Sequence, residues 1–277
     1  MDSLNAIILG ALQGVTEFLP VSSSGHLVLA ESFLGLNVSM LKSFDVAVHM
    51  GTLVSILVYF WKDFVEMFKA FFRIIFGKFS GNEYEKLVLY VVIGTIPAVI
   101  AGFLLGDLID SVFRGVSMVG ICMIATAMIF LVAEYVGSKK VFAQSDSMSF
   151  WKALIIGLFQ AIALIPGISR SGSTISAGLI CGMRREDAAR FSFLLGIPAI
   201  LGAGVLTFMG GGGMAGSAGV VTGNAAVAEL IPTLIGFVVS AITGFFAIYL
   251  LMRFLKKHSL VWFAVYLLVV GAVVCLI

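Results

Sequence analysis

Three ionisable side chains lie within otherwise apolar stretches of the sequence. Glu17 and His26 lie before and at the end of PVSSSGH (residues 20–26), and Arg170 lies in GISRSGS (residues 167–173). Both segments offer hydroxyl groups, small residues and backbone N–H groups where a helix could begin again. Helix N-termini bind anions, and a guanidinium group pairs with phosphate oxygens, so the two segments together predict a phosphate site. Ser- and Gly-rich breaks also line ion pathways, and Arg170 could merely pair with Glu17.

The spacing of the polar residues is also compatible with hydrolysis. Ser23 and His26 are three residues apart and share a face if the chain is helical there. The imidazole could then act as the base for the serine hydroxyl, or attack phosphorus itself. Gln13 and Glu17 are four residues apart, and a carboxylate there could hold the divalent cation that phosphoryl transfer commonly needs. Glu17 could equally be only an ion-pair partner, and Gln13 only a hydrogen-bonding residue between helices.

Three further polar residues give weaker signals. Asp45 and His49 are four residues apart at the entrance of an apolar run, where they could contact a metal ion or substrate. An interfacial or structural role for this pair is the competing interpretation. Glu31 is predicted to lie at the membrane interface.

The composition requires lipid as the solvent for most of these residues. The 277-residue chain is 60% hydrophobic and only 12% charged, whereas a soluble domain is about a quarter charged. An integral membrane protein is therefore predicted, and a soluble enzyme is excluded. Six runs have the length that a membrane-spanning helix needs: Phe44–Trp61, Leu87–Leu105, Ser117–Ala133, Phe191–Met209, Leu230–Met252 and Leu260–Ile277.

Two further apolar regions are interrupted. Leu4–Pro20 is followed by a polar break and then by only ten apolar residues, Leu27–Leu36. Trp151–Ile168 is followed in the same way by Thr174–Met183. Because ten residues cannot cross a bilayer, both regions are predicted to be re-entrant hairpins whose broken backbone is buried in protein.

The basic residues predict the orientation. Cytoplasmic loops carry an excess of Lys and Arg. Four loops together hold 14 of the 17 basic residues: five in 62–86 and three each in 134–152, 184–190 and 253–258. With six spans and two re-entrant hairpins, all four loops fall on one side, which must be the cytoplasm. Both termini are then predicted to lie outside.

An internal repeat relates the two interrupted regions. A shift of 147 residues places residues 10–35 over residues 157–182 without a gap, with seven identities in 26 positions. The same shift aligns Ser23 with Arg170, and it superposes the later spans. Each half then has one hairpin and three spans, and an odd number of spans gives the halves opposite orientations. Interrupted helices in an inverted repeat mark the functional site near the midplane of the membrane.

The predicted fold is therefore an all-α polytopic membrane protein with an inverted-topology repeat and six spans. Residues 1–277 form a single membrane domain, with the first repeat at about residues 1–135 and the second at about residues 148–277.

Two motifs resemble a known family. QGVTEFLPVSSSGH (residues 13–26) and PGISRSGST (residues 166–174) are similar to the signature motifs of the bacterial undecaprenyl-diphosphate phosphatases of the bacitracin-resistance (BacA/UppP) family, and the resemblance covers the whole chain. It implies hydrolysis of undecaprenyl diphosphate, a C55 lipid, to the monophosphate that carries cell-wall precursors for peptidoglycan synthesis. It also implies a role in bacitracin resistance, a divalent cation such as Mg²⁺ or Ca²⁺, and a bacterial plasma membrane location with the site open to the extracytoplasmic side.

The resemblance also implies roles for single residues. Ser23 becomes the nucleophile and His26 a base or alternative nucleophile, while Glu17 and Gln13 occupy the acidic-motif and metal positions. Gln13 stands where the family also uses Glu, and because an amide cannot act as a general base, Glu17 is the better candidate for that role. Arg170 becomes a catalytic residue that holds the diphosphate, together with Ser22, Ser24, Gly25, Ser169, Ser171, Gly172 and Thr174.

Other functions remain compatible with the sequence. Inverted repeats with broken helices are typical of transporters, so a transporter or a lipid carrier flippase is the main alternative. A structural or bacitracin-binding protein without chemistry would leave Ser23 and Arg170 dispensable. The predicted partners are the polyprenyl diphosphate lipid and the membrane, without nucleic acid, and a homodimer is left open.

Overall fold

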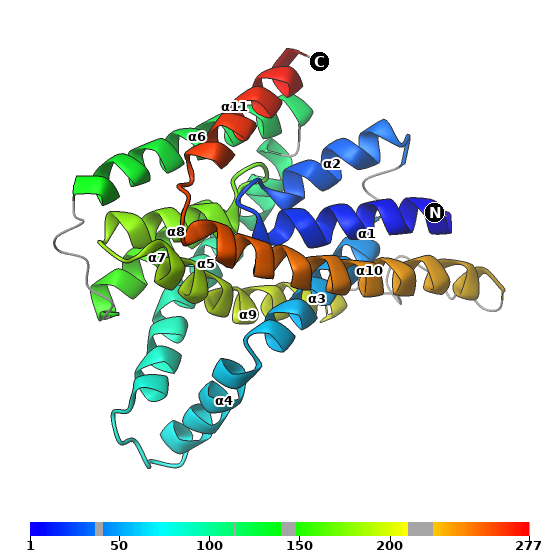
Figure 1. Ribbon diagram of the computed structural model, residues 1–277. Helices are drawn as coiled ribbons and strands as arrows, with labels where there is room; N and C mark the ends of the chain where they lie inside the picture. The colour runs from blue at the N-terminus through cyan, green and yellow to red at the C-terminus, as the bar shows by residue number, and fades with distance from the viewer. Residues whose placement is uncertain (37–40, 114, 140–147, 210–223, 277) are drawn as a thin grey trace.

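The computed structural model describes residues 1–36, 41–113, 115–139, 148–209 and 224–276, and their regular structure is entirely helical (Figure 1). Of the segments predicted above, residues 140–147 of the basic loop 134–152 and the last residue of the span Leu260–Ile277 lie outside this part of the chain. The helices are α1 (Ser3–Phe18), α2 (Ser23–Phe33), α3 (Lys42–Tyr59), α4 (Trp61–Ile75), α5 (Glu83–Val112), α6 (Val116–Lys139), α7 (Phe150–Ile162), α8 (Arg170–Ile180), α9 (Arg185–Met209), α10 (Asn224–Leu255) and α11 (Val261–Leu276).

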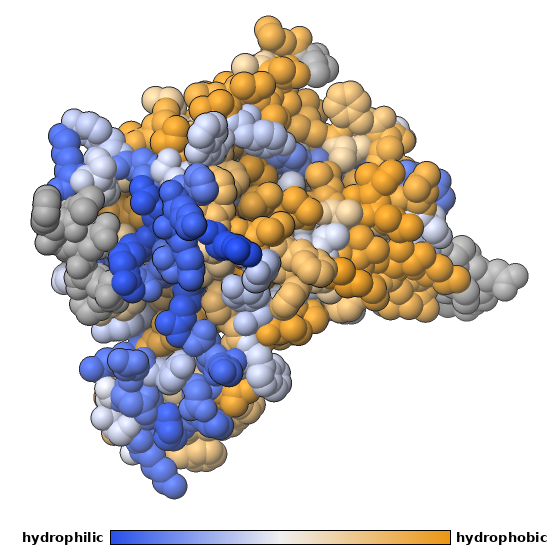
Figure 2. All heavy atoms as spheres, viewed as in Figure 1, coloured by the Kyte–Doolittle hydropathy of each residue, from blue (hydrophilic) through white to orange (hydrophobic). Residues whose placement is uncertain are grey.

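Several of these helices could cross a membrane. Within the described residues, α5, α6, α9 and α10 each contain a stretch that is long and apolar enough to do so. Helices α3 and α4 meet the same criterion only as a pair, bent by 91° at Phe60, while α7 and α11 are apolar but shorter. Figure 2 shows hydrophobic residues over most of the visible face, and hydrophilic residues gathered at its left edge and over the lower projection formed by α4 and the start of α5. The molecule is a polytopic helical membrane protein.

Helix α4 corrects the sequence prediction, which treated residues 62–86 as a loop. Its apolar residues recur at helical spacing, at Phe64, Phe68, Phe71 and Phe72, and its charged residues lie between them. Such a helix is amphipathic, so it does not have the continuous hydrophobicity by which a spanning segment is recognised. The predicted span Phe44–Trp61 ends instead at Tyr59.

The predicted cytoplasmic loop at residues 184–190 is also mostly helical, because α9 begins at Arg185, six residues before the predicted span. Acidic residues Glu186 and Asp187 occupy its first turn, where they interact favourably with the helix dipole. Arg185 and Glu134 form an ion pair between α9 and α6, and Glu134 also accepts a hydrogen bond from the backbone N–H of Leu260 at 2.8 Å, just before α11. This carboxylate therefore joins three helices.

Both predicted breaks are present, but the second lies earlier in the chain than predicted. Helix α7 ends at Ile162 and not at Ile168, because Pro166 and Gly167, whose φ is 92°, follow it, and the SRSGS segment (residues 169–173) caps and begins the next helix. The chain leaves α1 after Phe18 and restarts as α2 at Ser23, and it leaves α7 after Ile162 and restarts as α8 at Arg170. Ser169 caps α8 by accepting a hydrogen bond from the Gly172 N–H at 3.1 Å. The two restarting helices begin 147 residues apart, the same offset as the sequence repeat.

The start of α2 is held differently, by a strained residue. Ser22 has a left-handed backbone with φ 70°, the only such non-glycine residue among those described, and this conformation costs a serine about 1 kcal/mol or more. The Ser22 carbonyl accepts hydrogen bonds from the His26 N–H at 3.1 Å and from His26 Nδ1 at 2.8 Å. These two bonds fix the first turn of α2 and the imidazole together.

Glycines let the first helix of each broken pair approach a long helix closely. Helix α1 packs against α10, and a Cβ atom on Gly10 would lie 2.7 Å from the Gly236 carbonyl oxygen. Helix α7 packs against α5, and a Cβ atom on Gly157 would lie 2.5 Å from the Gly94 carbonyl oxygen. Backbone contact through small residues is a common way for helices to associate in membranes. These contacts set the position of each broken pair relative to the rest of the bundle.

Candidate active site

The carboxylate of Glu17 is the centre of a buried polar cluster. Its Oε1 accepts a hydrogen bond from Arg170 Nη2 at 2.6 Å. Its Oε2 accepts from Ser23 Oγ at 2.6 Å and from Gln13 Nε2 at 3.0 Å. His49 Nε2 lies 3.7 Å from the same oxygen. One carboxylate thus joins side chains from α1, α2, α3 and α8.

This cluster brings together the two interrupted regions, which the sequence predicted to contribute to one site. Ser23 is the first residue of α2, and Arg170 is the first residue of α8. Gln13 and Glu17 lie one turn apart on α1, so both can face the break. The serine and the arginine are donors to the same carboxylate, on its two different oxygens.

Helix α9 makes room for the arginine. The Arg170 guanidinium lies against Gly196, where an added Cβ atom would be 2.3 Å from Nη1. The same Nη1 donates to the backbone carbonyl of Ser192 at 3.4 Å. The Ser192 hydroxyl lies 2.6 Å from Thr174 Oγ1, which connects α9 to the first turn of α8. Gly196 and Ser192 therefore define the place of the guanidinium.

His26 is oriented away from Ser23 and toward α11. Its Nδ1 lies 2.8 Å from the Ser22 carbonyl oxygen, and its Nε2 lies 2.8 Å from the Tyr266 hydroxyl. Because a carbonyl oxygen can only accept, Nδ1 carries the proton, and in the neutral ring Nε2 accepts from Tyr266. Among the hydrogen bonds of the described residues, the Ser23 hydroxyl donates to Glu17 and none joins it to His26. The acceptor of the Ser23 hydroxyl is thus Glu17, whereas the spacing had suggested a contact with His26.

The other residues predicted to bind diphosphate are placed around the two helix starts. Ser169, Ser171, Gly172 and Thr174 are buried at the beginning of α8, where they pair mainly with one another and with the backbone. Gly172 also packs closely on Phe130, and a Cβ atom there would lie 2.2 Å from the ring.

The corresponding residues of α2 are Ser22, Ser24 and Gly25. Ser22 is buried and its hydroxyl has no hydrogen-bond partner, whereas Ser24 is half-buried. Gly25 packs against Met123, to whose terminal methyl an added Cβ atom would come within 2.5 Å. The α2 start therefore offers hydroxyl groups that other protein groups do not fully use.

Comparison with known proteins adds to this geometry. The family model of the bacitracin resistance protein BacA matches residues 6–273. This chain belongs to the BacA family. The match takes in α1 to α11 almost completely, and with them every residue of the Glu17 cluster. The resemblance inferred from the two motifs is confirmed.

Individual relatives of this BacA-family chain are named undecaprenyl-diphosphatase. One from Methanosphaera stadtmanae is 43% identical over 283 residues, which cover 99% of this chain and 97% of the relative. One from Rubrobacter xylanophilus is 41% identical over 276 residues, with the same coverage of each chain. One from Thermodesulfovibrio yellowstonii is 44% identical over 269 residues, covering 96% of this chain and 94% of the relative.

Some residues of the BacA-family site were missed or left open by the sequence. The sequence left the role of His49 open, and the structure places it beside Glu17. Tyr266 and Gly196 were not predicted at all. Glu31 of α2 is fully buried against other protein atoms, and its location at the membrane interface stays a prediction.

The cluster offers oxygen donors that suit a hard cation. Gln13 Oε1 is buried and has no hydrogen-bond partner, while the amide nitrogen of the same side chain donates to Glu17. Carboxylate and amide oxygens are ligands that Mg²⁺ and Ca²⁺ prefer. Across the described residues, His, Cys, Asp and Glu side chains do not gather in a group of three that could hold a metal ion. Any cation here would therefore depend on oxygens from substrate and water as well.

Proposed function

We propose that this protein is a membrane undecaprenyl-diphosphatase, which hydrolyses the C55 diphosphate to the monophosphate and inorganic phosphate. The observation that carries this proposal is the buried Glu17 carboxylate, which holds Ser23 from one broken helix pair and Arg170 from the other. The Glu17 carboxylate, as proton acceptor, is thereby hydrogen-bonded both to the nucleophile Ser23 and to the guanidinium of Arg170, which can bind phosphate. The names of the relatives that match this chain almost end to end agree with that chemistry.

In the proposed reaction, Arg170 moves from Glu17 to the oxygens of the diphosphate. A guanidinium binds phosphate oxygens through two parallel N–H groups. The Glu17 carboxylate then loses its ion pair with the Arg170 guanidinium, and it becomes a stronger proton acceptor for the Ser23 hydroxyl. Substrate binding and activation of the serine are coupled in this way through a single carboxylate.

The phosphoryl transfer itself has two balanced steps. Ser23 Oγ forms a bond to the terminal phosphorus as its proton passes to Glu17, the bond from phosphorus to the bridging oxygen breaks, and Glu17 passes this proton on to the departing lipid monophosphate. Water then attacks the phosphorus of the phosphoserine and gives one proton to Glu17, the bond from phosphorus to Oγ breaks, and Glu17 returns that proton to Ser23 Oγ as inorganic phosphate leaves. We assign the proton transfers to Glu17 because His26 Nε2 is engaged by Tyr266, while His26 or water as the attacking group is the alternative.

We assign the divalent cation, Mg²⁺ or Ca²⁺, to Glu17 and Gln13. The unpartnered Gln13 Oε1 supports this assignment. A bound cation supplies stabilisation of the negative charge that develops on the phosphoryl oxygens. Ser22, Ser24 and the first turn of α8 are proposed to contact the remaining diphosphate oxygens.

We also propose the inverted repeat, with two re-entrant hairpins and six spans, in a bacterial plasma membrane. The equal offset of α2 and α8 supports the repeat, as do the glycine contacts of α1 with α10 and of α7 with α5. The proposed orientation places both termini and the site on the extracytoplasmic side. It is supported by the hydrophilic residues gathered at one end of the molecule (Figure 2).

The decisive experiment is phosphate release from C55 diphosphate by the purified protein in lipid nanodiscs. Ser23→Ala and Arg170→Ala are each expected to lower kcat/KM by at least about 100-fold, since each removes a group acting on the transferred phosphoryl group. Ser138→Ala and Arg253→Ala are matched controls at exposed positions far from the cluster in the sequence, and they should retain activity. Addition of a chelator should abolish release, and Mg²⁺ or Ca²⁺ should restore it.

Two results would count against the proposal in different ways. Undiminished release by Ser23→Ala and Arg170→Ala would remove the site assignment and leave the activity standing. Absence of release by the wild-type protein with every divalent cation tested would favour the transporter or flippase instead.

A further inference from the structure

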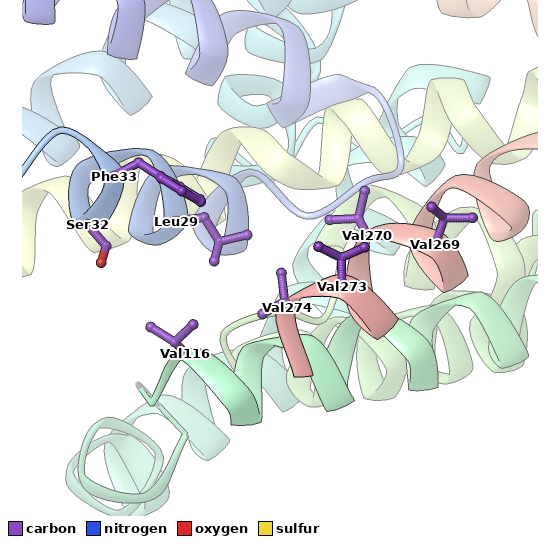
Figure 3. A pocket seen from close by; sticks show the side chains of 8 residues that line it. All are labelled: Leu29, Ser32, Phe33, Val116, Val269, Val270, Val273 and Val274. Carbon is purple, nitrogen blue, oxygen red and sulfur yellow. The ribbon is translucent and has the colours of Figure 1, made fainter. Parts of the chain in front are cut away.

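An apolar cavity of about 330 Å³ lies between α2, α6 and α11 (Figure 3). Figure 3 shows side chains of α2 on one side, including Leu29 and Phe33, and those of α11 on the other, including Val270 and Val273. Val116, at the start of α6, completes this lining. Ser32 contributes the only hydroxyl group among the lining residues that the structure describes. The cavity is therefore suited to a hydrocarbon group.

Helix α2 contributes residues both to the candidate active site and to the cavity. Ser23 begins this helix, His26 follows within one turn, and Leu29 lies three residues beyond His26 on the same side. At a rise of 1.5 Å per residue, Leu29 is about 9 Å from Ser23 along the helix axis, and Phe33 is about 15 Å away. A hydrocarbon chain attached to a diphosphate bound at Ser23 could thus reach the cavity with the carbon atoms nearest to the diphosphate.

Helix α11 approaches the active site in the same way. Tyr266 bonds to His26 and stacks on its ring, with ring centroids 5.8 Å apart. Val270, which lines the cavity, lies four residues beyond Tyr266 on α11. The His26–Tyr266 pair therefore lies between the polar cluster and the cavity on both helices.

We infer that this cavity holds the isoprenoid chain of the lipid substrate, starting with the units next to the diphosphate. This inference rests on the proposed phosphatase function, because the substrate of that reaction carries a charged diphosphate for the Glu17 cluster and a hydrocarbon chain attached to it. The chain must leave the polar cluster through apolar surroundings, and the cavity provides them from Leu29 onward, about 9 Å along α2 from Ser23. Burial of each CH₂ group stabilises the complex by about 0.8 kcal/mol, so the cavity adds affinity that the diphosphate alone lacks.

The cavity also opens toward lipid, which a C55 chain requires. Phe33 is 79% exposed and Val273 is 51% exposed at its edge. A cavity of this volume takes only part of such a chain, and the remainder continues into the bilayer. The His26–Tyr266 pair has a positioning role in this arrangement, since it separates the water-accessible chemistry from the hydrocarbon.

A bulky side chain in the cavity tests the inference kinetically. Val273→Trp is expected to raise KM for the C55 diphosphate about tenfold with little change in kcat, because loss of contact with about two CH₂ groups corresponds to that factor. Val132→Trp is a matched control, since Val132 is 52% exposed on α6 and lies 16 residues from Val116. Equal KM values for the two variants would overturn the inference while the phosphatase function stands.

Photo-crosslinking tests the same inference without relying on turnover. A prenyl monophosphate with a diazirine in the isoprene unit next to the phosphate should label peptides of α2 and α11, and excess unlabelled prenyl monophosphate should prevent the labelling. Val273→Trp should weaken the labelling and Val132→Trp should not. Labelling of other helices, or labelling that phospholipid competes for as well as prenyl phosphate does, would show that ordinary membrane lipid fills the cavity. This result can be obtained even if wild-type protein releases no phosphate, so failure of the cavity and failure of the activity are distinguishable.

Discussion

At the scale of single residues, the position of Arg170 at the start of α8 depends on the absence of a side chain at Gly196. Gly196 leaves the space in which the Arg170 guanidinium lies, and Ser192 provides a carbonyl for it. In this position the guanidinium faces Glu17, to which its Nη2 donates a hydrogen bond at 2.6 Å. Its ability to bind an anion there depends on this placement as much as on its charge.

Gly196→Ala is therefore expected to reduce activity without unfolding the protein. The added Cβ atom would lie 2.3 Å from Arg170 Nη1, so the guanidinium must move, and a displacement of about 1 Å can cost about 100-fold in rate. Phosphate release and the thermal unfolding temperature measured on the same sample separate the two effects. Gly202→Ala, on the same helix with open space around it, is the control and should behave as wild type. Equal activity of the two variants would show that the position of the guanidinium is not critical.

At the scale of helices, the first helix of each broken pair is held in close backbone contact with a long helix at glycine positions. Gly10 meets Gly236, and Gly14 lies against Ser240 and Thr243, so α1 is seated on α10 along two turns. The polar cluster lies at the end of α1, only one turn beyond Gly14. Any outward movement of α1 would carry Glu17 with it.

Gly10→Ala is expected to destabilise the protein by about 1–3 kcal/mol, because the backbone atoms that meet the new methyl group cannot rotate away. A lower unfolding temperature in nanodiscs would record this loss. Gly106→Ala, on α5 with open space around it, is expected to have no such effect or a slightly stabilising one. Unchanged stability of Gly10→Ala would mean that α1 and α10 are less tightly packed than their glycines indicate.

At the scale of the whole molecule, the charged residues define two ends. Ion pairs connect Asp63 of α4 with Arg190 of α9, and Lys256 beyond α10 with Glu186 of α9. These residues belong to loops and helix ends that the sequence assigns to one side of the membrane. Salt bridges at such exposed positions contribute little stability, so their value here is in showing which segments lie together.

The orientation can be checked by cysteine labelling. In a background with Cys122, Cys181 and Cys275 replaced by alanine, Lys256→Cys should react with a membrane-impermeant maleimide only after the cells are permeabilised. Asp2→Cys should react in intact cells, because the N-terminus is proposed to lie outside. Both positions are exposed in the structure. The reverse pattern would invert the proposed topology and move the site to the cytoplasmic side.

The sequence predicted the broken helices and the centre of the site because charged and polar residues stand out in apolar stretches. Glu17, Ser23 and Arg170 were recognisable for that reason, and the structure brings them into direct contact. Helix α4 was missed because an amphipathic helix with two lysines and an arginine resembles a loop when only spanning segments are sought. Tyr266 lies 240 residues from His26, and an aromatic residue in an apolar helix gives no sign of such a contact. Gly196 is one of 31 glycines, and only the structure shows that it lies against the Arg170 guanidinium.

The ion pair between Glu17 and Arg170 has a consequence for selectivity. The carboxylate is tethered to the fold and is always present beside the guanidinium, so it acts as a built-in competitor for any incoming anion. A ligand with more negative charge displaces a competitor of fixed charge more readily than a ligand with less. A lipid diphosphate would therefore displace the Glu17 carboxylate from Arg170 more easily than the monophosphate that hydrolysis leaves behind. After hydrolysis, the ion pair between Glu17 and Arg170 would form again and so favour release of the monophosphate.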